Sequence, residues 1–83
     1  EQLAAEIGVY PNPAQDRLFL DLPSELGEVS LTIRNSLGQI IARPNTPAIG
    51  GFIPTWELQN GQYWLVIATN EGQRITKPFL KGQ

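Results

Sequence analysis

The chain has 83 residues, enough for one small domain, and its hydrophobic fraction of 41% is ordinary for a globular protein. The formal net charge is −2 with the charges scattered, so we expect no nucleic-acid partner, and no apolar run approaches the roughly 20 residues that span a bilayer. Cysteine and histidine are absent, which removes disulfides, cysteine-based metal sites and the commonest general base.

The N-terminal half of the chain is predicted to form short strands. Residues 1–7 are expected to be a linker, and residues 8–83 to be the domain. From Ile7 onward, apolar and polar residues alternate with the period of a β-strand. The first strand stops at Pro11, because proline lacks a backbone N–H. The alternation predicts four strands in this half, at residues 7–10, 17–22, 29–35 and 39–43.

The C-terminal half predicts three further strands, at residues 51–58, 62–69 and 74–80. Pro54 and Pro78 interrupt the first and the last of these, which favours edge positions because proline cannot donate to a ladder. Glycine-containing hairpin loops are predicted at "NSLGQ" and "NEGQ". The sequence therefore predicts an all-β fold, an immunoglobulin-like β-sandwich of about seven short strands in two sheets.

The sequence contains no recognisable combination of catalytic residues. The serines have no histidine to activate them, and Asp21 lies on the polar face of its strand, where a carboxylate is usually solvated. The sequence contains neither a glycine-rich phosphate loop nor an EF-hand spacing of acidic residues. We therefore predict that the protein is not an enzyme and uses no cofactor and no metal.

One aromatic residue is a candidate for binding. Tyr63, Leu65 and Ile67 share the face of their strand that is predicted to be core, which places Trp64 on the outward face. An outward tryptophan could stack on a sugar or anchor a partner protein. The alternative is that a loop or the nearby Trp56 covers it, since tryptophan is highly buried on average.

Three motifs, taken in order, resemble one known family. They are "YPNPAQDRLFL", "IRNSLGQII" and "LQNGQYWLVI", followed by the closing hairpin "NEGQRITKPFLK". This series resembles the C-terminal sorting domains of the type IX (Por) secretion system, also called the type A sorting domain family. The resemblance covers Val9 to about Lys81, and the order and spacing of the motifs make the combination specific.

The resemblance implies a function that composition does not show. Such domains stand at the C-terminus of secreted Bacteroidota proteins and direct an N-terminal cargo domain from the periplasm across the outer membrane. Their implied partners are the outer-membrane translocon, a β-barrel shuttle protein and a sortase-like peptidase that removes the domain and attaches the cargo to the cell surface. The implied location is secreted or surface-bound, without a membrane span. Because the chain begins with Glu1, we expect it to be part of a longer or processed protein.

Two groups of residues correspond to the family motifs. The first group is expected to be mainly structural and comprises Pro11, Asn12, Pro13, Gly38, Leu58, Gly61, Tyr63, Leu65 and Ile67. The second group lies at the end of the chain, where the translocation machinery is expected to read it through an unpaired strand edge. It comprises Arg74, Lys77, Phe79, Leu80, Lys81, Gly82 and Gln83.

Two alternatives remain open from the sequence. One is a carbohydrate-binding or adhesive module of a larger secreted protein, for which Trp56 and Trp64 are the best support. The other is a structural spacer that stabilises a neighbouring domain. Loss of glycan binding in Trp64→Ala with intact secretion would favour the first. A lowered melting temperature of the parent protein with intact export, after removal of the module, would favour the second.

Overall fold

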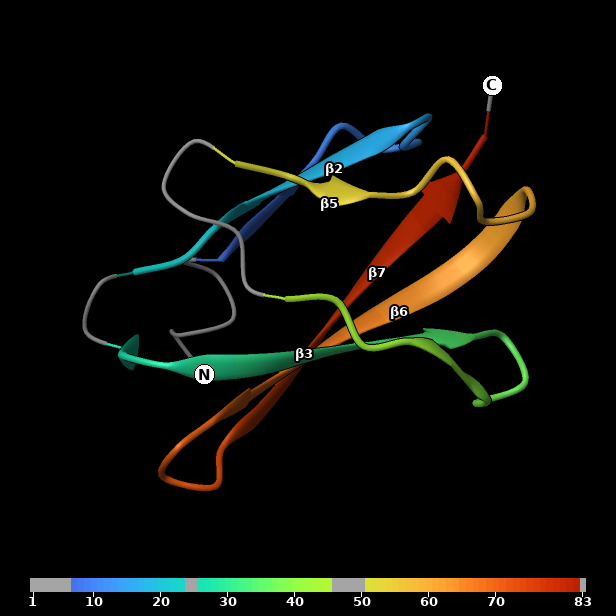
Figure 1. Cartoon of the computed structure of the whole chain (residues 1–83). Helices are drawn as coiled ribbons and strands as arrows, with labels where there is room; N and C mark the ends of the chain where they lie inside the picture. Colours follow the sequence, from blue (N-terminus) through green and yellow to red (C-terminus); the bar gives the residue numbers. More distant parts are fainter. Residues whose placement is uncertain (1–6, 24–25, 46–50, 83) are drawn as a thin grey trace.

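Two antiparallel sheets face each other in the computed structural model, which describes residues 7–23, 26–45 and 51–82 (Figure 1). The small sheet has the strand order β1-β2-β5, and the large sheet has the order β4-β3-β6-β7. Within the described residues, the seven strands are β1 Gly8–Tyr10, β2 Arg17–Asp21, β3 Val29–Asn35, β4 Ile40–Ala42, β5 Ile53–Pro54, β6 Gly61–Thr69 and β7 Arg74–Lys81. The predicted all-β sandwich is confirmed.

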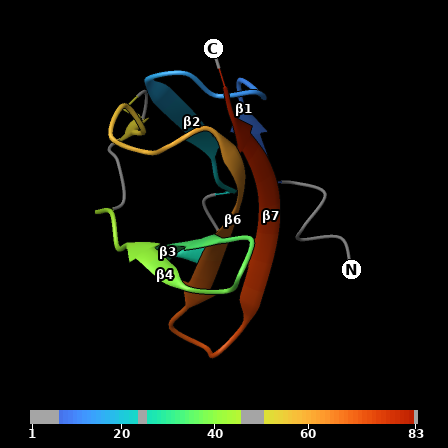
Figure 2. The same cartoon turned by 90° about the vertical axis from the view of Figure 1, so that its right-hand side faces the viewer.

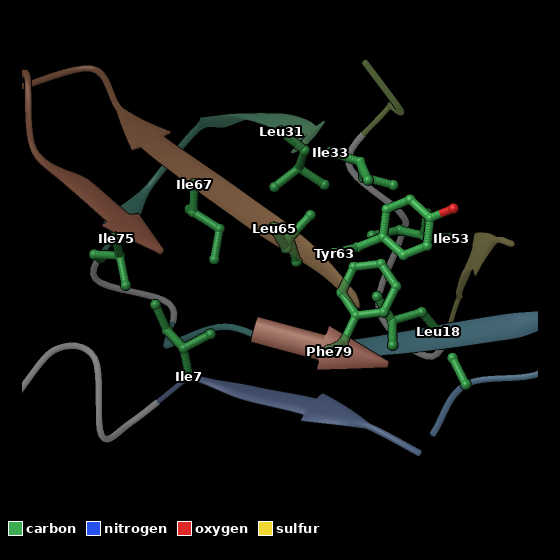
Figure 3. Close-up of a cluster of buried hydrophobic side chains, with 11 residues drawn as sticks. Ile7, Leu18, Leu31, Ile33, Ile53, Tyr63, Leu65, Ile67, Ile75 and Phe79 are labelled. Carbon is green, nitrogen blue, oxygen red and sulfur yellow. The ribbon is translucent and has the colours of Figure 1, made fainter. Parts of the chain in front are cut away.

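The core fills the space between the two sheets (Figure 3). Alternate residues of β6 point inward, so Tyr63, Leu65 and Ile67 are buried as predicted. The Tyr63 ring stacks on Phe79 of β7 with 5.6 Å between ring centroids, and its hydroxyl donates to the Gln59 carbonyl oxygen at 2.7 Å. The remaining buried apolar residues are Ile7, Ala14, Leu18, Leu31, Ile33, Ile53 and Ile75.

The N-terminal boundary of the packed region reaches Ile7. The predicted linker ends at this residue and the first predicted strand begins there, and its side chain is buried in the core and 3% exposed. Residues 1–6 lie outside the described residues. The first residue that contributes to the described core therefore precedes β1 by one position.

The two strand prolines behave differently. Pro54 ends β5, which is only two residues long and lies at the edge of the small sheet, as predicted for a proline-containing strand. The edge position predicted for Pro78 is also confirmed, since β7 lies at the edge of the large sheet. The prediction that Pro78 interrupts the last strand is wrong, because β7 runs through it and pairs it with Trp64. In an antiparallel ladder the backbone groups of alternate residues point away from the neighbouring strand. Since Leu80 points its backbone groups away from β6, so does Pro78, and its missing N–H costs no bond to β6.

The hairpin between β3 and β4 forms where it was predicted. The Gly38 N–H donates to the Asn35 carbonyl oxygen at 2.9 Å, and the Asn35 side chain accepts from the N–H groups of Leu37 and Gln39. Gly38 has a φ of 85°, a conformation that favours glycine because residues with a Cβ rarely adopt it. This motif residue therefore shapes a turn.

An aromatic layer covers the outer side of the small sheet. Phe19 stacks on Tyr10 with ring centroids 5.7 Å apart and meets the edge of Phe52 at 6.1 Å. The Arg17 guanidinium carbon lies 4.7 Å from the centre of the Phe52 ring. Arg17 and Phe19 therefore lie on the face of β2 opposite the buried Leu18, where Phe19 is half-buried and Arg17 is exposed.

Candidate functional site at the end of the C-terminal strand

The last strand lies at one edge of the large sheet. β7 pairs residue by residue with β6, from Arg74 opposite Ala68 to Lys81 opposite Gly61. Its side chains alternate between the core and the solvent, so Phe79 is 1% exposed and Leu80 is 44% exposed. Its C-terminal end rises beside the small sheet (Figures 1 and 2).

A proline-containing loop closes the outer edge of this strand end. We call residues 11–14 the proline loop; both of its prolines follow cis peptide bonds. The Asn12 side-chain oxygen accepts a hydrogen bond from the Leu80 N–H at 2.9 Å. The Ala14 N–H donates to the Leu80 carbonyl oxygen at 2.6 Å, and the Gly82 N–H donates to the Ala14 carbonyl oxygen at 2.8 Å. The end of β7 is therefore bonded on both edges.

The segment that follows the proline loop is anchored as well. Thr55, which follows β5, is 1% exposed, and its hydroxyl donates to the Gln15 carbonyl oxygen at 3.0 Å. Its backbone N–H donates to the Asp16 carbonyl oxygen at 2.9 Å. Ala14 itself is completely buried. The chain from the proline loop to β2 is thus held between β7 and the residue after β5, which limits how far the loop can move away.

These contacts correct one prediction. The end of β7 was expected to be an unpaired edge, but the outward backbone groups of Leu80 and the N–H of Gly82 have partners in the proline loop. Pro78, the preceding outward position, has no N–H to offer. Strand addition at residues 80–82 would first have to displace the proline loop, so the folded domain does not offer this part of β7 as a ready template.

The residues predicted for the site fall into separate environments. Those of the third motif belong to the core or its border: Tyr63, Leu65 and Ile67 are buried, Leu58 is partly buried against the core, and Gly61 begins β6. In the last strand, Phe79 is a core residue, whereas Arg74 and Leu80 are exposed. Lys77, Lys81 and Gly82 are half-buried, and Gln83 lies outside the described residues.

The structure brings together two motifs that are far apart in sequence. Asn12 and Leu80 are separated by 68 positions, yet they share a hydrogen bond. A Cβ added to Gly82 would lie 3.4 Å from the Cβ of Pro13, so the last residues run directly beside the loop. Sequence reasoning missed this pairing because neither motif carries a local signal for its distant partner.

Trp64 lies on the outer face of the large sheet and is 37% exposed, as its strand position predicted. Trp56 does not cover it. Trp56 is 58% exposed and lines a cleft of about 390 Å³ with the core residues Ile33 and Ile53, on the inner side of β3. The two tryptophans therefore lie on opposite sides of the large sheet, and the alternative in which one shields the other is wrong.

The described residues carry neither a metal-binding cluster nor a membrane-spanning helix. They contain no group of three or more histidine, cysteine, aspartate or glutamate side chains that could hold a metal ion. Among the same residues, we find no helix with the length and apolar character required to cross a membrane. The features that remain as a candidate site are the strand end, the proline loop beside it and the exposed side chains of β7.

A comparison with known families agrees with this geometry. The family described as secretion system C-terminal sorting domain matches residues 8–81, from β1 to the end of β7. No curated protein and no solved structure matches the chain. The match covers all seven strands of the described sandwich. The chain therefore belongs to the C-terminal sorting domains of the type IX secretion system, which are non-catalytic signals for the export of a cargo protein.

Proposed function

We propose that the translocation machinery recognises the end of β7, within residues 74–83, and that the rest of the domain holds this segment in a fixed position. The observation that carries the proposal is the contrast at Leu80. Its backbone is bonded to the proline loop through both its N–H and its carbonyl oxygen, while its side chain remains 44% exposed. A fixed backbone with an exposed apolar side chain loses little conformational entropy on binding, which favours recognition.

Membership of the family supports a proposal about the partners and the route. The sorting domain of a secreted or surface protein interacts with secretion machinery. We infer that the readers are the outer-membrane translocon and its β-barrel shuttle protein, which would receive the cargo from the periplasm. A sortase-like peptidase would then remove the domain and link the cargo to the cell surface. In this scheme residues 8–83 form the signal, and residues 1–7 lead from the cargo domain.

A secretion assay tests the proposal. Residues 1–83 are fused behind a reporter that carries an N-terminal signal peptide, and the fusion is expressed in a host with an active type IX system. The unmodified fusion should reach the medium or the cell surface, and a fusion that lacks residues 74–83 should remain in the periplasm. The deletion also removes the core residue Phe79, so a second variant is needed to separate recognition from folding.

That second variant is Leu80→Asp, because the Leu80 side chain is exposed and pairs across the sheet with Gln62. Circular dichroism of the purified chain should show that the sandwich still forms. Leu37→Asp is the matched control, since Leu37 is 81% exposed in the hairpin between β3 and β4. Export should fall in Leu80→Asp and persist in Leu37→Asp. Full export of both the deletion and Leu80→Asp would show that the end of β7 is not the recognised segment.

A further inference from the structure

A line of paired residues crosses the outer face of the large sheet. Ile40 of β4 lies opposite Arg34 of β3, which lies opposite Trp64 of β6, which lies opposite Pro78 of β7. Directly paired residues point to the same side of a sheet. Since Trp64 points away from the core, all four side chains belong to the outer face. We call these four residues the outer row.

Three of the four residues of the outer row are apolar, and these three remain accessible. Trp64 is 37% exposed and Ile40 is 42% exposed, and Pro78 is also exposed. Leu80, the exposed residue of the strand end, belongs to the same face because it pairs with Gln62 beside Trp64. This surface therefore continues directly from the segment that we propose to be recognised.

The charge of this face differs from that of the whole chain. The chain has eight acidic and six basic residues. The paired outer-face positions of β3, β6 and β7 carry no acidic residue, and their charged residues are Arg34 and Arg74. One Arg34 nitrogen donates to the Gly38 carbonyl oxygen at 2.7 Å, which orients the guanidinium group. Because arginine has five N–H donors, others remain to bind a carboxylate.

We propose that the outer face is a docking surface for a protein of the export machinery, one that offers an apolar pocket for Trp64 and carboxylates for Arg34 and Arg74. This inference rests on the proposed function for the setting in which the partner acts. Tryptophan and arginine are the residues that most often dominate binding at interfaces. The positive face of an acidic chain calls for a partner with negative groups around its pocket.

The size of the face favours a transient partner over a second copy of the chain. Four strands spaced about 4.8 Å apart and up to nine residues long, with a rise of about 3.3 Å per residue, give a face of at most roughly 600 Å². A stable interface needs about 800 Å² from each partner. A signal that the export machinery binds and then releases needs only a reversible interface, and the smaller area is sufficient for that.

The chemistry of the face also favours a protein as the binding partner over a membrane or a glycan. Recognition of anionic lipid surfaces usually takes clusters of about four to eight basic residues, and this face has Arg34 and Arg74. In the outer row Trp64 lies between Arg34 and Pro78, and Leu80 is nearby on the β7 side. A sugar that stacks on the ring needs polar groups around it, whereas the β7 side of Trp64 is apolar. An apolar pocket in a protein with an acidic rim fits both features.

The test uses the exported reporter fusion with matched tryptophan variants. Trp64→Glu and Arg34→Glu should each lower export at least about tenfold, a loss that corresponds to a moderate interface hot spot. Arg34→Lys keeps the charge and should be exported better than Arg34→Glu. Trp56→Glu is the control, since Trp56 is more exposed and lies on the other side of the sheet. It should be exported like the unmodified fusion.

Folding and partner identity are checked separately. Thermal melting of the purified 83-residue chain shows whether each variant folds, and Ile40→Glu replaces Trp64→Glu if that variant does not. A photo-cross-linking amino acid at position 64 then reports what touches the face in living cells. A cross-link to a protein of the outer membrane or periplasm that disappears with Arg34→Glu supports the proposal.

Three results would overturn the docking surface. They are export of the folded outer-row variants at the level of the unmodified fusion, a cross-link from position 64 to a glycolipid or glycan, and a cross-link to a second copy of the chain. In each of these cases the unmodified fusion is still exported, so the proposed function stands. If the unmodified fusion itself stays in the periplasm, the proposed function fails and the docking surface fails with it.

Discussion

The hydrogen bond between the Asn12 side chain and the Leu80 N–H allows a sharp test of how the end of the chain is held. In Asn12→Ala the acceptor is lost, while the two backbone bonds between Ala14 and the strand end remain available. The Leu80 N–H points away from β6, so water is its replacement partner. We therefore expect a local loosening of the strand end in a domain that remains folded.

The magnitude follows from the type of bond. A neutral hydrogen bond contributes about 0.5–1.5 kcal/mol, and this one is solvent-exposed, so we expect a loss of about 0.5–1 kcal/mol. For a domain of this size, 1 kcal/mol lowers the melting temperature by about 4–8 °C. The same free energy corresponds to roughly a fivefold change in an equilibrium constant. The Leu80 amide should therefore exchange its hydrogen up to about five times faster.

Hydrogen exchange measured by NMR on the purified chain is the appropriate assay. Asn12→Asp is the matched control, because its carboxylate retains an oxygen that can accept from the Leu80 N–H. Exchange at Leu80 should be close to that of the unmodified chain in Asn12→Asp and faster in Asn12→Ala. Equal exchange at Leu80 in all three proteins would refute the conclusion that Asn12 holds the strand end.

Three further changes test other contacts of the sandwich by urea unfolding. Phe79→Ala should lower the free energy of unfolding by about 3–5 kcal/mol, because Phe79 is buried against Tyr63. Leu80→Ala should change it by no more than about 0.5 kcal/mol, because Leu80 is exposed. Similar losses in the two variants would contradict the inward and outward alternation of the β7 side chains. Thr55→Val should cost about 1–3 kcal/mol, since it leaves the Gln15 carbonyl oxygen without its partner, and an unchanged midpoint would argue against that contact. Gly38→Ala should lower the free energy of unfolding by about 1 kcal/mol because of the positive φ of Gly38, although the added methyl group meets no atom within 4 Å. A stabilised variant would show that the turn differs from the one described.

The sequence by itself was sufficient to predict the class of fold and most of the core. The alternation with period two assigned each side chain of β6 to one face, so the inward positions of Tyr63, Leu65 and Ile67 and the outward position of Trp64 could be predicted. Gly38 indicated the β3–β4 turn, because a backbone position with a positive φ strongly favours glycine. The three motifs in order were enough to indicate the sorting-domain family.

The tertiary structure decided how the strand edges are occupied. Side-chain alternation indicates which face of a strand is apolar, but it does not show which backbone groups meet another segment. The bond from Asn12 to Leu80, across 68 positions, therefore had no signature in either motif, and the end of β7 was wrongly expected to be unpaired. For the same reason Pro78 was expected to interrupt a strand that tolerates it, because its missing N–H faces away from β6.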